Sequence, residues 1–600
     1  MAELTPIVLC LSRAGEATAH RVAAALNAPV HGREGRVEKA DAFFPNALEH
    51  VRMLFQAGHP VVGVCAAGIL VRAVAPVLAD KRSEPPVIAI PDDGSTVIPL
   101  LGGHHGANRF AKEIAQALGS HAAITTAGDV SLGIALDEPP IGWRLKNPED
   151  AKPVMMAMLN GQKPIIEGEN IWGLEAGDGP VKLVTSEAPV QTGETVLAYH
   201  PQRFALGLGC ARGCGVEEIW ALVQESLLAA NIAPEAIACV ASLDLKADEP
   251  AMIETAKRLG VPYRVFTAAE LEGEASRLEN PSEVVFAEVG CHGVSEAAAL
   301  AMAGPDGVLA VEKRKTLNAT CAIARAPAPI VGLKGRARGK LSIVSIGPGQ
   351  HSWRTPEASG LIAQAEELIG YGLYIDLLGP LAAGKKRSDF PLGGEEDRCR
   401  YALEQAGKGK SVALICSGDA GIYAMGALVY ELLDRGPEAM GVSDAAKRVE
   451  VVSTPGVSAL QGAAARAGAP LGHDFCAISL SDLLTPREDI LKRLKAAAEG
   501  DFVIAFYNPV SKRRRTLLAE ARDILLGHRP KETPVMLASN LGRPSEAVRY
   551  VRLDELRVDD VDMLTVVLVG SRHSKLAMLG EGARMYTPRG YARKIDGDLS

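Results

Sequence analysis

The chain has 600 residues, with 64 lysines and arginines against 72 aspartates and glutamates, for a formal net charge of −8. Hydrophobic residues make up 47% of the chain, which excludes global disorder and is enough for about four domain cores. A mildly acidic chain gives no electrostatic reason to expect a nucleic-acid partner. No apolar run reaches roughly 18 residues, so we expect no membrane span. Because we also expect no secretory leader, we predict a cytoplasmic location in which the cysteines are reduced.

Strand and helix patterns alternate from the start of the chain. Ile7–Leu11 and residues 60–65 are apolar runs typical of buried strands, whereas residues 13–26 and 46–57 show helical spacing. Prolines then interrupt this rhythm, it returns near Phe204, and a stretch rich in Pro, Gly and Arg follows Ala326. We therefore predict a multi-domain α/β fold with Rossmann-like domains in the N-terminal half. The predicted domains are 1–130, an irregular domain at 131–202, 203–328, and a last domain at 341–585. A protease-sensitive linker at 329–340 precedes the last domain.

Five polar or glycine-rich loops each follow a predicted strand in the last domain. Ligands bind at the carboxyl ends of strands in open α/β sheets, so loops at this edge are candidates for one binding site. Taken alone, each loop is also explained as a simple connection between a strand and a helix. The loops are Gly347–Gly349, Ser417–Gly421, Thr454–Ala459, Tyr507–Pro509 and Ser539–Pro544.

The order of these loops and their neighbours resembles a known family. GPG, SGDAGIY, STPGVSALQGAAARAGAPLGHDF, FYNPVSKRR and PVMLASNLGRP are similar to the class III tetrapyrrole methyltransferases, and within them to the precorrin-3B C17-methyltransferases of cobalamin biosynthesis. The resemblance covers about residues 340–585. It implies two α/β subdomains with S-adenosylmethionine between them, methylation of the precorrin substrate at C17 with ring contraction to precorrin-4, and a homodimer.

The resemblance also assigns residues to the two ligands. It implies that the methyl donor is held by Gly418, Asp419, Ala420, Gly421, Ser458, Ala459, Tyr507 and Asn508, and that the tetrapyrrole is bordered by Gly347, Pro348 and Gly349. From the residues alone, Asp419 is equally explained as the cap of a helix that begins near Ile422. Related methylases often have Asp after GPG, where this chain has Gln350 and His351, so a carboxylate role there is in doubt.

Ring contraction requires removal of a proton from the hydroxyl at C20, a task for a group that titrates near neutrality. His351 is our candidate for this base, with Asp482 and Tyr507 in reserve. The alternative is that His351 only hydrogen-bonds backbone. The basic run Lys512–Arg515 either meets substrate carboxylates or forms a solvated helix start.

The N-terminal half carries a second set of candidate residues. Gly102–Asn108 places two adjacent histidines, His104 and His105, between glycines, and we predict that Asn108 caps the following helix. Free amides at such a helix start suit an anion or a developing oxyanion. Further along, Arg212 lies in GLGCARGCG and could hold a carboxylate, while the lone C-x3-C lacks the paired spacing of a zinc site, so we expect no metal.

GGHHGANRFAKEIAQALG, GLGCARGCGVEEI and VSEAAALAMAG resemble the CbiG family of cobalamin biosynthesis, over about residues 1–328. The family's implied activity is opening of the ring A δ-lactone of cobalt-precorrin-5A with release of acetaldehyde. Two alternatives stay open: the methylase acts on cobalt-factor III of the anaerobic route, and the N-terminal half only binds or hands over a corrinoid.

Overall fold

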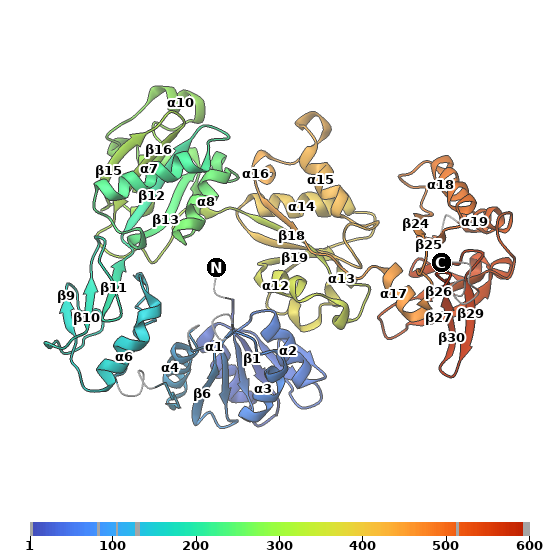
Figure 1. Cartoon of the computed structure of the whole chain (residues 1–600), viewed down its shortest axis with the longest axis horizontal. Helices are drawn as coiled ribbons and strands as arrows, with labels where there is room; N and C mark the ends of the chain where they lie inside the picture. The colour runs from blue at the N-terminus through green and yellow to red at the C-terminus, as the bar shows by residue number, and fades with distance from the viewer. Residues whose placement is uncertain (1–3, 81–83, 104–105, 127–131, 512–514, 592–600) are drawn as a thin grey trace.

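The computed structural model describes residues 4–80, 84–103, 106–126, 132–511 and 515–591, which form four α/β regions in chain order (Figure 1). Each of the first three is built on one sheet, and the last contains three sheets. The fold is mixed α/β, as predicted. No helix among these residues is both long enough and apolar enough to cross a bilayer.

The first region is a seven-stranded sheet in the order β3-β2-β1-β4-β5-β6-β7 with helices on both faces. Its core strands β1, β4 and β5 are buried along their whole length, as a parallel sheet covered by helices requires. The elements are β1 (Ile7–Cys10), α1 (Glu16–Leu26), β2 (Val30–Arg33), β3 (Ala42–Phe44), α2 (Ala47–Gln56), β4 (Val61–Val64), α3 (Ala67–Val74), β5 (Val87–Ile90), β6 (Thr96–Leu101), α4 (Ala107–Leu118) and β7 (His121–Ala122).

The proline-interrupted stretch forms a small sheet in the order β8-β11-β10-β9 with one helix against it. Tyr199 is fully buried at its centre and donates a hydrogen bond to the carbonyl of Leu136. The elements are β8 (Trp143–Leu145), α6 (Ala151–Leu159), β9 (Ile165–Glu167), β10 (Lys182–Thr185) and β11 (Val196–Pro201).

The third region is a six-stranded sheet in the order β15-β16-β12-β13-β14-β17. Helix α11 is buried along its length against β12, and the approach is so close that a Cβ on Gly207 would lie 1.9 Å from the carbonyl oxygen of Ser295. The elements are β12 (Phe204–Cys210), α7 (Val216–Ala229), β13 (Ile237–Leu243), α8 (Pro250–Leu259), β14 (Tyr263–Phe266), α9 (Ala268–Glu272), α10 (Glu283–Val289), α11 (Ser295–Ala303), β15 (Val308–Lys315), β16 (Ala319–Arg325) and β17 (Arg336–Ala337).

The segment predicted as a linker is fastened at both sides. Its strand β17 pairs antiparallel with β14 of the preceding sheet. Arg336 contacts both neighbours, with Nη2 donating to Asp244 at 2.6 Å and Nη1 to the carbonyl of Gly407 at 2.6 Å. Strand pairing and arginine contacts thus order a segment whose composition indicated a flexible connection.

The last region contains two subdomains, and the first is a parallel sheet in the order β20-β19-β21-β18-β22. Its elements are β18 (Lys340–Ser345), α12 (Pro356–Gln364), β19 (Glu367–Tyr371), α13 (Gly372–Asp376), β20 (Lys386–Phe390), α14 (Glu395–Gly407), β21 (Ser411–Cys416), α15 (Gly426–Asp434), α16 (Asp444–Lys447) and β22 (Glu450–Ser453). The helix expected to begin near Ile422 begins at Gly426, because the preceding residues form the loop described below.

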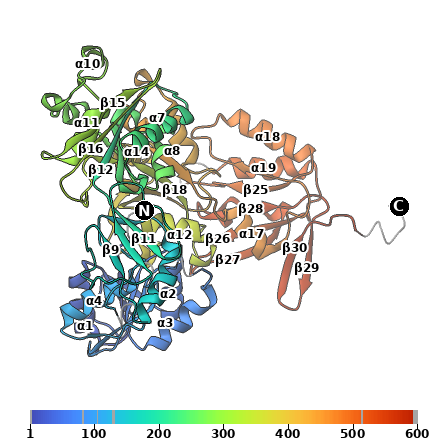
Figure 2. The same cartoon turned by 60° about the vertical axis from the view of Figure 1, so that its left-hand side comes forward.

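The second subdomain has a mixed sheet in the order β24-β25-β28-β26-β27 and a small sheet, β23-β30-β29. In both views it lies at one end of the molecule, beyond the first subdomain (Figures 1 and 2). Its elements are α17 (Ala459–Ala467), β23 (Gly468–Ala469), β24 (Phe475–Ser479), α18 (Arg487–Glu499), β25 (Val503–Tyr507), α19 (Leu517–Leu526), β26 (Pro534–Ser539), β27 (Ala547–Arg552), β28 (Thr565–Val569), β29 (Lys575–Leu579) and β30 (Gly582–Tyr586).

One hydrophobic core joins the N-terminal region to the first subdomain. Buried residues of α2 and α3, such as Leu54 and Leu70, belong to the same cluster as Ile362 of α12 and Leu381. Arg354, 8% exposed, adds a contact across this boundary from Nη2 to the sulfur of Met53 at 3.4 Å. The N-terminal region therefore packs on the methylase-like part as one continuous core.

Candidate active site

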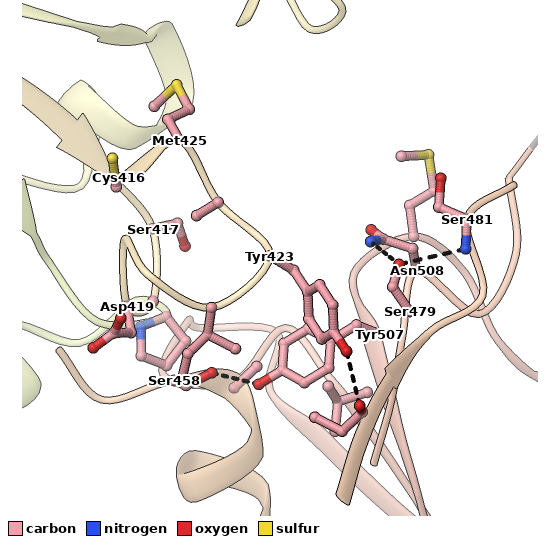
Figure 3. Close-up of a pocket in the computed structure, with 18 of the residues that line it drawn as sticks. Cys416, Ser417, Asp419, Tyr423, Met425, Ser458, Ser479, Ser481, Tyr507 and Asn508 are labelled. Carbon is pink, nitrogen blue, oxygen red and sulfur yellow. Dashed lines mark hydrogen bonds between the residues drawn. The ribbon is translucent and has the colours of Figure 1, made fainter. Parts of the chain in front are cut away.

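A cavity of about 630 Å³ lies between the two subdomains of the last region, and the loops that leave their sheets line it (Figure 3). This volume is within the range of small-molecule sites. The lining includes these residues predicted to bind a ligand: Pro348, Gly418, Asp419, Ser458, Ala459, Tyr507 and Asn508.

Two glycine loops pair with each other beneath the cavity. Gly347 and Gly418 exchange backbone hydrogen bonds of 3.2 and 2.9 Å, and both have positive φ, of 73° and 72°. A Cβ on Gly418 would meet nothing closer than Cα of Ser458 at 3.9 Å, so the glycine leaves an open backbone cradle toward the cavity. The positive φ explains why glycine occupies this position, and the absence of a side chain keeps the cradle open.

Asp419 ties this loop to the next one. Its Oδ1 accepts the N–H of Gly421 at 2.8 Å and its Oδ2 accepts the N–H of Gly456 at 3.0 Å. Below it, the buried Ser345 donates to the carbonyl of Thr454 and accepts the N–H of Ala420. Asp419 thus orders two cavity loops and does not cap a helix as the alternative interpretation proposed.

The second subdomain contributes Tyr507 and Asn508 at the end of β25. The Tyr507 hydroxyl is hydrogen-bonded to Ser458 Oγ and accepts the N–H of Leu460, so it fixes the start of α17, and burial raises its pKa. Asn508, with φ 49°, donates to Ser479 Oγ at 3.1 Å. These contacts position the backbone at the cavity. Because the Tyr507 hydroxyl already has two hydrogen-bond partners, it is a poor candidate for the catalytic base.

Tyr423 spans the cavity and was not among the predicted site residues. Its hydroxyl donates to the carbonyl of Ala477 on β24 at 2.8 Å, joining the loop of one subdomain to the sheet of the other (Figure 3). Its ring centroid lies 5.2 Å from that of Tyr507. In the sequence, the position of Tyr423 directly after the GDAGI motif could have indicated that it belongs to the site.

Charged side chains of both signs line the cavity, and of its arginines the sequence indicated only Arg543, within the loop Ser539–Pro544. Arg543 is held by its Nε, which donates to the carbonyl of Pro348 at 3.1 Å across the subdomain boundary. The arginines of the lining are Arg398, Arg493 and Arg543, and the carboxylates are Glu395, Asp419 and Glu431. Apart from Asp419, the other charged residues lie on helices outside the predicted loops, so no motif marks them.

Other predicted residues lie elsewhere. His351 begins a short 3₁₀ turn, and neither it nor Asp482 belongs to the described lining of the cavity. His104, His105 and residues 512–514 lie outside the described residues. Arg515, the last of the basic run, pairs with Asp559.

One prediction for the N-terminal half needs correction, and a second remains a prediction. Asn108 does not cap α4, because the cap is Gly106 with φ 86°, and the Asn108 side chain instead donates to Thr126 Oγ1 at 3.0 Å. The role of Arg212 in holding a carboxylate stays a prediction, and its guanidinium is already hydrogen-bonded within the chain. It donates to Asp248 and to the carbonyl of Leu245, both at 2.7 Å, since the chain supplies acceptors at the next strand end.

Comparison with known proteins agrees with this architecture. The family model of the Tetrapyrrole (Corrin/Porphyrin) Methylases matches residues 340–557, and those of the Cobalamin synthesis G N-terminus and C-terminus match 49–129 and 204–324. A Precorrin-3B C(17)-methyltransferase of Sinorhizobium sp is 43% identical over 42% of this chain and 98% of that protein. The chain belongs to the tetrapyrrole methylase family.

Further relatives resemble two parts of this tetrapyrrole methylase. A probable cobalt-factor III C(17)-methyltransferase of Salmonella typhimurium is 42% identical over 42% of the chain and 99% of that protein. The solved methyltransferase CobJ is 37% identical, covering 42% of this chain and all of its own, with a TM-score of 0.38. CobE is 35% identical over 21% of this chain and 92% of its own, with a TM-score of 0.20. The three family models and the two curated relatives confirm the family resemblance that the motifs indicated for both halves.

Proposed function

We propose that this protein uses S-adenosylmethionine to methylate C17 of precorrin-3B, with ring contraction to precorrin-4. The convergence of Pro348, Gly418, Ser458 and Tyr507 on one cavity carries the proposal, because these residues come from loops far apart in the sequence. The 43% identity to a Precorrin-3B C(17)-methyltransferase supports the choice of reaction.

Methyl transfer from a sulfonium needs positioning more than activation, since the donor already carries a good leaving group. The open glycine cradle at Gly418 fits a donor that approaches backbone closely, and the Asp419 clamp keeps that cradle in place. We propose that Gly418–Gly421, Ser458, Ala459, Tyr507 and Asn508 hold the donor and that Gly347–Gly349 border the tetrapyrrole.

His351 stays our proposal for the base of ring contraction, three residues beyond Pro348 in the chain. His351 does not line the described cavity, so its role as the base must be tested by substitution. If His351→Ala contracts the ring at the wild-type rate, measured by single-turnover absorbance, His351 is not the base.

The deciding experiment gives the full chain labelled donor with precorrin-3B and, in parallel, with cobalt-factor III. We expect label at C17 of precorrin-3B and a ring-contracted product by mass spectrometry. Transfer to cobalt-factor III alone would support the second candidate, which the 42% identity to the Salmonella relative favours. Transfer to neither would refute the proposed function.

For the N-terminal half we propose a CbiG-like role, either lactone opening in cobalt-precorrin-5A or hand-over of a corrinoid. The full chain is the right material, because a fragment would expose the core shared with the methylase part. Acetaldehyde release from cobalt-precorrin-5A would support the hydrolase, and its absence would leave binding or hand-over.

We also propose that the enzyme is cytoplasmic and that it dimerises through the methylase part. Light scattering of the full chain tests the dimer.

A further inference from the structure

Arg398 is a buried cation in the wall of the cavity. It lies in the first turn of α14 and is only 2% exposed. Around it the cavity is lined by Cys416 at the end of β21 and by Met425. A guanidinium in such surroundings is costly unless its donors are hydrogen-bonded and its charge is compensated.

The chain itself satisfies this guanidinium poorly. Its Nη2 donates to the carbonyl of Pro391 at 3.0 Å, and its Nη1 faces the sulfur of Met425 at 3.3 Å, which is a weak acceptor. Its Nε is buried and has no hydrogen-bond partner among the described residues. The nearest carboxylate, Glu395, is 4.0 Å away and 46% exposed, so it neither hydrogen-bonds Arg398 nor compensates its charge fully.

We infer that Arg398 receives a carboxylate of a ligand bound in this cavity. The planar guanidinium fork matches a carboxylate with two parallel hydrogen bonds, and a ligand that excludes water would strengthen them. The inference rests on the proposed function, which supplies two ligands of this chemistry: the aminoacyl end of the methyl donor and the acid side chains of the tetrapyrrole.

Arg529 is a suitable contrast within the same domain. It is also buried, and its Nε and Nη2 have no hydrogen-bond partner among the described residues, although its Nη1 donates to the carbonyls of Phe502 and Gly570. Unlike Arg398, it is not in the described cavity lining. Its substitution removes a buried guanidinium without touching the ligand site. Arg529→Gln therefore reports what a purely structural loss does to binding.

The test compares ligands with and without the carboxylate, by calorimetry on the full chain. For the donor, S-adenosylhomocysteine is compared with 5′-methylthioadenosine, which lacks the aminoacyl end. For the tetrapyrrole, uroporphyrin with eight carboxylates is compared with coproporphyrin, which has four. Arg398→Gln should reduce the preference for the carboxylate-bearing ligand in one of the two pairs by about tenfold or more, the effect of losing a charged hydrogen bond. The pair that responds identifies the source.

Two further variants keep the test decisive if Arg398→Gln does not fold. Arg398→Lys retains charge without the fork, so the preference should fall but not vanish. Glu395→Gln removes a competing negative charge from a half-exposed position and should raise the preference about twofold or more. Arg529→Gln should lower the melting temperature and leave both preferences unchanged.

The outcomes separate this inference from the proposed function. If the wild-type chain binds the probes and every variant keeps both preferences within twofold, Arg398 is structural and the inference is wrong. If the wild-type chain binds neither pair, the proposed function fails, and the inference with it.

Discussion

At the scale of single residues, Tyr423 combines a strained backbone with a contact that joins the two subdomains. Its φ of 51° belongs to the left-handed region, which side chains other than Asn and Asp rarely adopt. The contact from its hydroxyl to the carbonyl of Ala477 helps to hold it there. Strain that persists at a ligand cavity indicates a backbone shaped for function.

We predict that Tyr423→Phe loosens the cavity without unfolding the chain. The loss of one partly exposed hydrogen bond costs about 1 kcal/mol, and the freer loop should raise KM for the methyl donor several-fold with a smaller effect on kcat. Tyr430→Phe is the matched control, because Tyr430 is similarly exposed, at 53%, on α15. Equal KM values for the two variants would contradict the role given to Tyr423.

Two glycine substitutions should have opposite effects, one abolishing ligand binding and the other increasing stability. Gly418→Val places a β-branched residue at φ 72° and fills the cradle, so it should abolish S-adenosylhomocysteine binding in calorimetry while circular dichroism stays native. Gly360→Ala in α12 meets open space and should stabilise the helix by about 1 kcal/mol with no loss of binding. Retained binding in Gly418→Val would remove this loop from the donor site.

At the scale of elements, the connecting segment 329–340 behaves as part of two folded units. Strand β17 extends one sheet, and Arg336 contacts Asp244 before it and Gly407 after it. Protease sensitivity depends on burial and hydrogen bonding of the backbone, so the early cleavage expected from composition should not occur here.

We predict that Arg336→Ala restores that sensitivity. The variant loses both contacts, so trypsin cleavage between 326 and 340 should accelerate several-fold relative to wild type, as read by mass spectrometry of limited digests. Arg314→Ala on the exposed strand β15 is the control. Early cleavage of the wild-type chain in this window would show that the segment is a free linker after all.

At the scale of the whole molecule, the N-terminal region and the first methylase subdomain share a core that buries three histidines. His31 and His59 line a cavity of about 60 Å³ with Lys385. Burial lowers the pKa of His31 and His59 to about 4 and that of His50, hydrogen-bonded to His31, to about 3. The interface therefore holds neutral imidazoles beside a lysine.

The stability of this interface should depend on pH in a definite direction. The folded-state pKa values lie below the ordinary 6.5, so the unfolded state binds protons first and stability falls as the pH drops from about 6.5 toward 4. His59→Asn, whose amide nitrogen takes the position of Nδ1 and can keep the hydrogen bond to the carbonyl of Thr5, should flatten the decline of melting temperature between pH 7 and 5. His473→Gln, at an exposed position, should not change it.

The sequence by itself determined the α/β class, the family of both halves and the loops that meet at the cavity. Apolar runs that end in glycine-rich turns encode strands and their carboxyl-end loops locally, and parallel strands bring such loops to one edge. The motifs therefore sufficed to predict four residues of the cavity: Pro348, Gly418, Ser458 and Tyr507. The sequence also offered cations for carboxylates of the substrate, but it placed them at Arg212 and Lys512–Arg515.

Only the tertiary structure decided which charges and contacts reach the site. Arg398 and Arg543 lie far apart in the chain, and both line the cavity because it is formed between two subdomains, whereas Arg212 pairs with Asp248. Composition predicted a loose linker, yet strand pairing and Arg336 fasten it. These outcomes depend on contacts between residues distant in sequence, and periodicity and spacing report only on neighbours along the chain.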